Sequence, residues 1–439
     1  GVDPNREDVE VNVRRAVFYP ERPGNDYITV RGFTMEHAAT PWAPPTAEQI
    51  GLIGTHWSKG WIIENNVISD SRCVGITLGK DRDTGHNVWS ANRDKDGATH
   101  YNEVIFRALK AGWSREMIGS HVVRNNTIYN CEQAGIVGSL GGVFSQIYDN
   151  HIFDIWTKRA FSGAEIAGIK IHASVDMVIR NNRIHNVGRG IWIDWMAQGT
   201  RITRNLLYDN TTDDLFSEVN HGPYVVDNNI FLSDISIRDW SGGGAFVQNL
   251  IAGKISTFAE LNRFTPYLFP HETMVAGLKN IEGGDNRFYN NIFAGPTHQA
   301  ADRDFSKEWG NLADGLAVYS DAGLPMFAGG NLYYNGAQPM SQEPGYIVED
   351  HDPLIRIEDD PENAYLYITF HASLMEMDKG WLNSVLFDRT KVSNLPFEDP
   401  SGLPIVFDKD FFNQKRSESN PSAGPFEMIT EGEMRLKVW

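Results

Sequence analysis

An asparagine-bearing motif that recurs along the first three quarters of the chain most constrains its fold. The motif lies in short segments such as "HVVRNNTIY" and "MVIRNNRIH", which alternate in twos and are rich in Val, Ile and Tyr, as β-strands are. Several copies are separated by 20 to 24 residues. A repeat of this length predicts a solenoid of strands rather than a series of independent domains. The equivalent asparagines are Asn66, Asn126, Asn150, Asn182, Asn205, Asn229, Asn249 and Asn291.

The repeat length favours a right-handed parallel β-helix, and the fold class is therefore all-β. Asparagine tolerates left-handed backbone angles at a corner, and equivalent asparagines in successive coils can hydrogen-bond to one another. A leucine-rich repeat has a similar period, but its leucine consensus is absent. The longer gaps, between Asn66 and Asn126 and between Asn249 and Asn291, predict loop excursions or coils whose asparagine is lost.

The period fades beyond about Gly336, which divides the chain into two parts. We expect a β-helix over residues 1–340, incomplete at its N-terminus, and a β-rich extension over 341–439 that packs on or caps the helix. The first residues contain neither an initiator Met nor an apolar signal core, and strand-like sequence begins almost at once. We therefore expect an N-terminal portion to be missing, and a cytoplasmic location is favoured only weakly over secretion.

The composition of the chain excludes several classes of ligand and partner. A chain of 439 residues with 41% hydrophobic residues can bury a core, and a formal charge of −18 disfavours nucleic acid and anionic membrane surfaces. Cys73 and Cys131 stand in neither a disulfide framework nor a metal-ligand spacing, so we expect no metal and no cofactor. No apolar run is long enough to span a membrane. A neutral or cationic ligand fits this balance best.

Strands that follow the asparagine corner can be aligned from coil to coil. They are "GIKIH" at 168–172, "GIWID" at 190–194, "DLFSE" at 214–218 and "DISIR" at 234–238. Their mainly apolar alternate positions predict an inward face. The outward positions then form two ladders, the first of Lys170, Trp192, Phe216 and Ser236 and the second of His172, Asp194, Glu218 and Arg238.

Asp194 and Glu218 lie at one position of adjacent strands, which places their carboxylates roughly 5 Å apart. Retaining glycosidases use about 5 to 5.5 Å, whereas inverting enzymes need about 6.5 to 9.5 Å. Two such charges cannot both ionise freely, so one pKa must rise and that carboxyl becomes the acid. These residues alone do not say which one. The alternative is a surface row of ion pairs without catalysis.

Further polar and aromatic residues surround this pair in the sequence. Trp192 precedes the pair on the same face and suits stacking on a sugar ring. The other residues that we expect to bind substrate or tune the carboxylates are Glu165, His172, Asn220, His221 and Arg238.

The motifs "TPWAPPTAEQIGLIGTHWSKGWIIENNVIS", "AGIKIHAS", "GIWIDW" and "DLFSEVNHGP" resemble glycoside hydrolase family 120. The similarity runs over most of residues 7–340. The resemblance implies a retaining β-xylosidase on a right-handed parallel β-helix with an associated β-sandwich, much of it contributed by N-terminal sequence that this chain lacks. It also implies Asp194 as nucleophile and Glu218 as general acid/base.

The resulting hypothesis is an exo-acting enzyme that releases xylose from the non-reducing end of β-1,4-xylo-oligosaccharides by double displacement. The missing N-terminal wall makes a homo-oligomer plausible. The alternatives are a β-helix polysaccharide lyase, an inverting pectinase and a non-catalytic carbohydrate-binding β-helix. A lyase needs a cationic base and often Ca²⁺ for uronate, which an acidic chain with aromatics beside its carboxylates does not favour.

Overall fold

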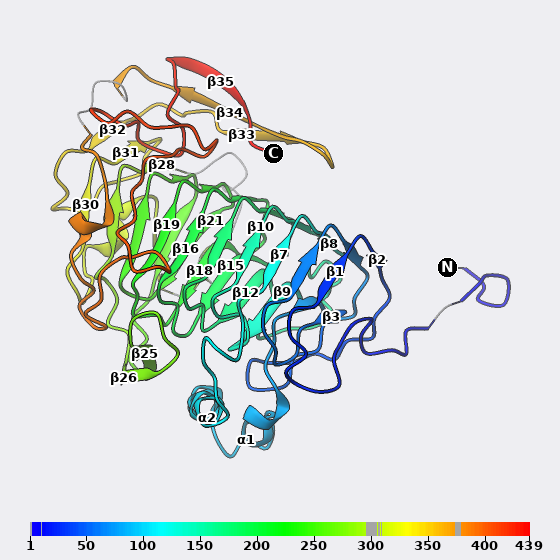
Figure 1. Cartoon of the computed structure of the whole chain (residues 1–439). Helices are drawn as coiled ribbons and strands as arrows, with labels where there is room; N and C mark the ends of the chain where they lie inside the picture. The colour runs from blue at the N-terminus through cyan, green and yellow to red at the C-terminus, as the bar shows by residue number, and fades with distance from the viewer. Residues whose placement is uncertain (1, 10, 296–304, 306–307, 309, 374–378) are drawn as a thin grey trace.

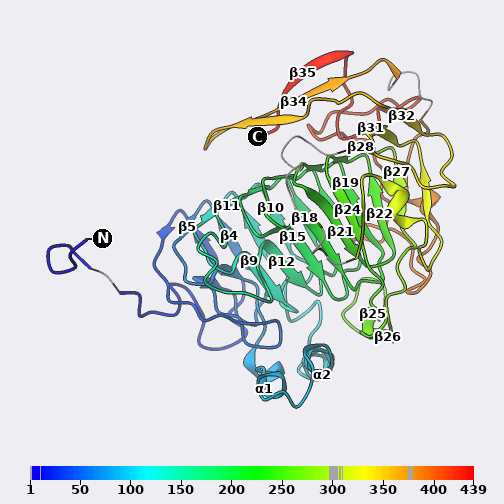
Figure 2. The same cartoon turned by 180° about the vertical axis from the view of Figure 1, so that it is seen from behind.

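The chain winds into a β-helix whose coils form three long sheets, almost entirely parallel, along the molecule (Figures 1 and 2). This confirms the predicted fold class. The computed structural model describes residues 2–9, 11–295, 305, 308, 310–373 and 379–439. Each regular coil places one strand in sheet B, one in sheet C and one in sheet A, in chain order. Equivalent strands of successive coils pair side by side, so one side chain stacks on its equivalent in the next coil.

The strands of each sheet are short. Sheet B contains β1 (Thr29–Arg31), β4 (Ile62–Glu64), β7 (Val122–Arg124), β10 (Gln146–Tyr148), β13 (Val178–Arg180), β16 (Thr200–Thr203), β19 (Tyr224–Asp227), β22 (Gly244–Val247), β27 (Arg287–Tyr289) and β30 (Phe327–Gly329). Sheet C contains β2 (Thr34–Met35), β5 (Val67–Ser69), β8 (Thr127–Tyr129), β11 (His151–Phe153), β14 (Arg183–His185), β17 (Leu206–Tyr208), β20 (Ile230–Phe231), β23 (Leu250–Ile251), β28 (Ile292–Ala294), β31 (Leu332–Tyr334) and β32 (Ile347–Glu349). Parallel pairing thus continues to β32, a little beyond residue 340.

Sheet A has longer strands and carries the site described below. It contains β3 (Ile53–Gly54), β6 (Val74–Thr77), β9 (Ala134–Ser139), β12 (Ala167–His172), β15 (Arg189–Asp194), β18 (Asp213–Glu218), β21 (Ile235–Trp240), β24 (Lys254–Thr257) and β29 (Asn311–Ala313). The edge strand β29 pairs with β24 antiparallel. The inward side chains of all three sheets are mainly Ile, Leu, Val and Phe and form one continuous buried core.

The predicted asparagine ladder runs the length of the helix between sheets B and C. Each side-chain amide donates to the amide oxygen of the next asparagine at 2.9–3.0 Å, from Asn66 through to Asn291. Asn331 adds a further rung that the sequence did not reveal, and the Glu343 carboxylate accepts its amide at 2.6 Å. Each ladder asparagine therefore satisfies buried polar groups of its neighbours.

The left-handed corner predicted for these asparagines is wrong by one residue. The positive φ falls on the residue before each ladder position, for example Asn125 (φ 53°), Asn181 (φ 53°) and Gln248 (φ 55°). The ladder asparagine itself is left with its amide turned into the interior, where the stack needs it. Asparagine pairs in the sequence therefore combine a corner residue with a ladder residue.

Both long gaps in the repeat are excursions from the coils. The first contains helices α1 (Val88–Ala91) and α2 (Gly97–Lys110), which the strand-dominated pattern did not predict. The second contains the antiparallel hairpin of β25 (Thr265–Leu268) and β26 (Val275–Lys279). Both lie on the same side of the helix (Figures 1 and 2), and a shared apolar cluster joins α2 to β25.

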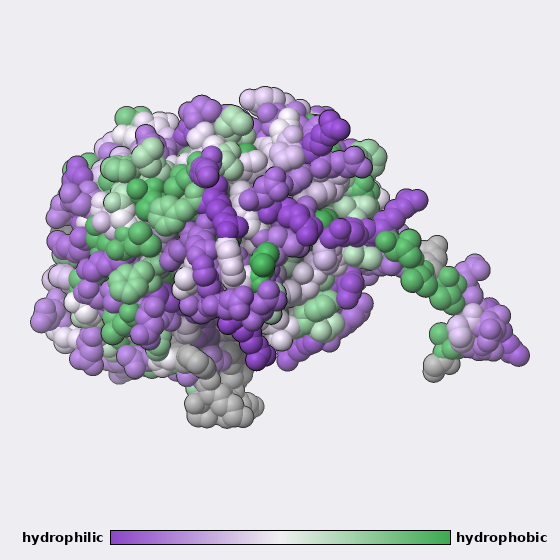
Figure 3. All heavy atoms as spheres, turned by 90° about the horizontal axis from the view of Figure 1, so that it is seen from below, coloured by the Kyte–Doolittle hydropathy of each residue, from purple (hydrophilic) through white to green (hydrophobic). Residues whose placement is uncertain are grey.

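The C-terminal extension packs on the outside of the solenoid. Its antiparallel strands β33 (Arg356–Asp359), β34 (Ala364–Phe370) and β35 (Gly432–Lys437) cover outward residues of sheet C such as Leu250 and Ile292. At the other end of the molecule the segment before β1 projects as an arm (Figures 1 and 3). Its first four valines, Val2, Val9, Val11 and Val13, are 62–80% exposed.

Candidate active site

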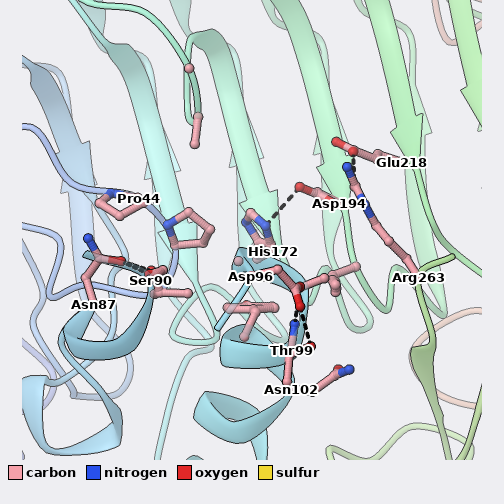
Figure 4. A pocket seen from close by; sticks show the side chains of 18 of the residues that line it. Pro44, Asn87, Ser90, Asp96, Thr99, Asn102, His172, Asp194, Glu218 and Arg263 are labelled. Atoms are coloured by element: carbon pink, nitrogen blue, oxygen red, sulfur yellow. Dashed lines mark hydrogen bonds and ion pairs between the residues drawn. The ribbon is translucent and has the colours of Figure 1, made fainter. Parts of the chain in front are cut away.

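A cavity of about 1050 Å³ lies against the outer face of sheet A. Sheet A forms its floor, with Lys170, His172, Trp192, Asp194 and Glu218. Its walls come from elsewhere: the segment with Trp42 to Thr46, the α1–α2 excursion, and the stretch with Glu260 to Phe264 before β25. Figure 4 shows His172, Asp194 and Glu218 on neighbouring strands, with α2 beside them and Arg263 approaching Glu218.

The register of sheet A confirms part of the predicted ladders and corrects the rest. His172 pairs with Asp194, and Asp194 pairs with Glu218, as predicted. The next strand is shifted by two residues, so Trp240 rather than Arg238 lies beside Glu218. The prediction took a step of 20 residues from Glu218, whereas the true step is 22, the same as from His172 to Asp194, and the apolar alternation alone fits either register.

Asp194 is held as a carboxylate. Its Oδ2 atom accepts hydrogen bonds from Lys170 Nζ at 2.5 Å and from His172 Nε2 at 2.8 Å. Burial alone would raise the pKa of this carboxyl, but His172 and Lys170 together lower it well below its usual range. Among the described residues no donor bonds Oδ1, so this oxygen is available to the cavity.

The pKa of Glu218 is shifted in the opposite direction to that of Asp194. Burial and the neighbouring Asp194 charge raise the pKa of Glu218, against the opposing influence of Lys170 and Arg263. Its Oε2 accepts from the Trp192 indole N–H at 3.1 Å, and its Oε1 accepts from Arg263 Nη1 at 2.5 Å. Two adjacent carboxyls with diverging pKa values are the arrangement that separates a nucleophile from an acid.

Trp192 does not offer its ring to a sugar, as the sequence had suggested. The Lys170 ammonium lies 3.0 Å from the ring centroid, and Phe216 stacks on the ring with centroids 5.1 Å apart. Only 8% of Trp192 is exposed. Because the ring already packs against these neighbours, the indole N–H that it donates to Glu218 is its contribution to the cavity.

Glu165 lies behind the floor of the cavity and is fully buried. Its Oε1 accepts from Gln49 Nε2 at 3.0 Å and lies 3.6 Å from His172 Nδ1. Burial raises the pKa of Glu165 to about 8, with Asp194 adding to the effect against Lys170. The structure therefore places Glu165 next to His172, which contacts Asp194, and not on the cavity surface.

Two other predicted binding residues, Asn220 and His221, lie outside the cavity. Asn220 donates to the backbone oxygen of Ile193, and its own oxygen accepts from the backbone N–H of Ala197. His221 contacts the backbone oxygens of Thr265 and Lys279 and so fixes the β25–β26 hairpin. These residues follow Glu218 in the sequence, but the chain turns away from the cavity directly after β18.

Arg238 lies on β21 of sheet A, two residues before the position that is paired with Glu218. It donates to Asp213 at 2.9 Å and to Glu308 at 2.9 Å, and it does not line the cavity. Its predicted place beside Glu218 is therefore wrong, since the register shift moves it next to Phe216.

The sequence missed the residues that wall the cavity, above all Arg263. Lys170 was placed on the correct ladder but not recognised as the partner of Asp194. The two long gaps in the asparagine spacing were the available signal, because both walls contributed by excursions come from these gaps.

Within the described parts of the chain, no group of three or more His, Cys, Asp or Glu side chains is arranged to hold a metal ion. Among the described helices, none is both long and apolar enough to cross a bilayer.

A parallel β-helix that presents a neighbouring Asp and Glu in a large cavity defines a carbohydrate-active protein with a glycosidase-type site. Comparison with known proteins agrees. The solved complex of XylC with xylose matches 100% of this chain and 70% of the XylC chain, at 45% identity and a TM-score of 0.92. The chain belongs to the family of XylC, glycoside hydrolase family 120, and is a β-xylosidase homologue.

A family model described as the periplasmic copper-binding protein NosD matches residues 52–220, a stretch of the solenoid. Among proteins with curated functions, none matches the chain.

Proposed function

We propose that this protein is a retaining, exo-acting β-xylosidase that removes xylose from the non-reducing end of short β-1,4-xylo-oligosaccharides. The observation that carries the proposal is the Asp194–Glu218 pair: directly paired residues of parallel strands, whose general spacing of about 4.7 to 4.9 Å suits a retaining pair, with pKa values driven in opposite directions. Membership in the family of XylC, which was solved in complex with xylose, supports xylose as the glycone.

In the first step Asp194 Oδ1 attacks the anomeric carbon and forms a glycosyl-enzyme ester. The bond to the leaving oxygen breaks with its electron pair going to that oxygen, which takes the proton from Glu218. Lys170 and His172 keep Asp194 anionic through its other oxygen, so the nucleophile needs no proton transfer of its own.

In the second step Glu218 acts as a base. It takes a proton from water as the water oxygen attacks the anomeric carbon, and the ester electron pair returns to Asp194. Loss of the Asp194 charge in the ester removes one cause of the raised pKa of Glu218, so the carboxyl becomes a carboxylate when a base is needed.

The cavity supports a short oligosaccharide as the substrate. A volume of about 1050 Å³ is at the upper end for small-molecule sites and exceeds the need of a single pentose. The α1–α2 excursion and the 260–264 stretch both wall it and contact each other through Asn102 and Phe264, which closes this part of the cavity and favours a chain end over the middle of a polymer.

The experiment that tests the proposal follows the configuration of the first sugar released. The protein is mixed with an aryl β-xyloside, and the anomeric protons are recorded by NMR before mutarotation. We expect β-xylose first. Initial α-xylose would indicate inversion, and the absence of any product from aryl xylosides and xylobiose would leave a lyase, which needs a uronate, or a binding protein.

A further inference from the structure

Arg263 is the one cation that reaches the acid/base residue from outside sheet A among the described residues. It belongs to the stretch before β25, and its side chain is 37% exposed at the cavity. Its Nη1 donates to Glu218 Oε1 at 2.5 Å, while its Nε lies 3.6 Å from Glu260 Oε2 on the same stretch. The guanidinium therefore has two carboxylates within reach, one in the site and one on its own segment.

The two oxygens of Glu218 are not equivalent. Oε2 accepts from the Trp192 indole, which can only donate, and the carbonyl oxygen of a carboxylic acid is a better acceptor than its hydroxyl oxygen, so this bond favours Oε2 as the carbonyl oxygen. The proton of the acid form is therefore favoured on Oε1. Arg263 also can only donate, and it occupies Oε1. The contact seen in the structure thus fits the carboxylate form of Glu218 and opposes the acid form.

We propose that Arg263 is a positioning residue for the base half of the reaction: it binds Glu218 Oε1 when Glu218 is a carboxylate and releases it when Glu218 carries the proton. This inference rests on the double-displacement mechanism proposed above. After Glu218 has given its proton to the leaving oxygen, Arg263 returns to Oε1. When Glu218 takes a proton from the attacking water, Arg263 moves off Oε1 toward Glu260.

Among the described charged groups around Glu218, Arg263 is the one whose side chain has room to move. Asp194 on β15 and Lys170 and His172 on β12 also face Glu218, and these three are buried in fixed contacts with one another. Glu260 approaches from the same stretch as Arg263. The Asn102 amide of α2 donates to the Phe264 backbone oxygen at 2.9 Å and fixes that backbone while the Arg263 side chain remains partly exposed.

The test compares Arg263→Met with Arg263→Lys, and uses Lys279→Met as the control. Lys279 lies on β26 of the same excursion, is 41% exposed and pairs with Glu282, away from the cavity. Loss of the guanidinium raises the pKa of Glu218, so the basic limb of the kcat/KM profile for xylobiose should move up by about one pH unit. Arg263→Lys should restore most of this shift, and Lys279→Met should leave the limb in place.

A second readout separates the two steps. With a 2,4-dinitrophenyl xyloside the leaving group needs no acid, so kcat reports deglycosylation and the base form of Glu218. On the acidic limb of its pH profile, Arg263→Met should lower this kcat about tenfold, in line with one pKa unit. Unmoved pH limbs together with equal losses on both substrates would show that Arg263 only supports the fold and would overturn the inference.

If Arg263→Met does not fold, Glu260→Gln keeps the inference testable. Without the competing carboxylate Arg263 stays on Glu218, so the basic limb should move to lower pH. An unchanged limb would contradict the two-position model. Failure of the proposed function is recognised separately, by wild-type protein that releases no β-xylose from the aryl xyloside.

Discussion

The asparagine ladder and the catalytic ladder are both rows of side chains at one position of successive coils, yet they do opposite things. In the asparagine ladder every amide donates to the next rung and accepts from the previous one. In the catalytic ladder His172, Asp194 and Glu218 are different in kind, and two like charges lie side by side. Chemical uniformity makes the first ladder a stabilising element, while the mixture in the second shifts pKa values and provides reactivity.

Removing the nucleophilic charge should break the catalytic ladder most severely. Asp194→Asn keeps the shape of the side chain and an acceptor for Lys170 and His172, but it removes the anion. We expect kcat/KM for an aryl xyloside to fall by about 10⁴-fold or more, with the denaturation midpoint nearly unchanged. Steady-state kinetics and thermal melts of the same preparation check this. A loss of less than tenfold would exclude Asp194 as nucleophile.

The second-largest effect should come from Glu218→Ala. We expect turnover of xylobiose to drop by about 10² to 10⁴-fold, because general acid catalysis is lost, while a 2,4-dinitrophenyl xyloside is still cleaved in the first step. Added azide should restore turnover and yield β-xylosyl azide, since a small anion can attack the ester without a base. The products are identified by mass spectrometry and NMR. Equal losses on both substrates without azide rescue would contradict the assigned role.

Much of this comparison could be predicted from the sequence because both ladders follow the period of the coil. Spacing alone located eight rungs of the asparagine ladder and the His172–Asp194–Glu218 row. Asn331 was missed, although Gly330 before it takes the same positive φ as the corner residues of the other rungs. The register at Arg238 was missed because strand alternation repeats every two residues and leaves a two-residue shift undetermined.

The cavity walls could not be predicted for a different reason. The repeat determines where a strand residue lies, but an excursion such as 258–279 has no period, and its position depends on contacts far apart in sequence. Gln198 illustrates this, since its amide donates to the Leu268 backbone oxygen at 3.1 Å and accepts from the Leu268 N–H at 3.1 Å. Arg263 reaches Glu218 only because β25 is held there.

A break in the asparagine ladder should affect stability and leave chemistry intact. Asn182→Ala removes the amide between Asn150 and Asn205 and leaves buried backbone groups, such as the Ile147 oxygen, without that donor. We expect a destabilisation of about 3 kcal/mol with kcat/KM within about twofold of wild type. Urea denaturation measures this, with Asn92→Ala as an exposed control. An unchanged midpoint would mean that the ladder adds nothing to stability.

The smallest expected effect concerns Glu165, a buried carboxyl beside the catalytic ladder that makes the stability of the fold depend on pH. Burial raises the pKa of Glu165 to about 8 from an ordinary value of 4.5, so the folded protein holds a proton that the unfolded chain releases between these values. Stability should therefore fall as pH rises from about 4.5 to about 8. Glu165→Gln, which mimics the protonated side chain, should flatten the melting temperature across this window by a few degrees. Glu36→Gln, at an exposed carboxyl, should leave the profile as in wild type. If the melting temperature of Glu165→Gln depends on pH as that of the wild type does, Glu165 is ionised in the folded protein. The negative charges of Glu165 and Asp194 would then be compensated by the positive charges of His172 and Lys170.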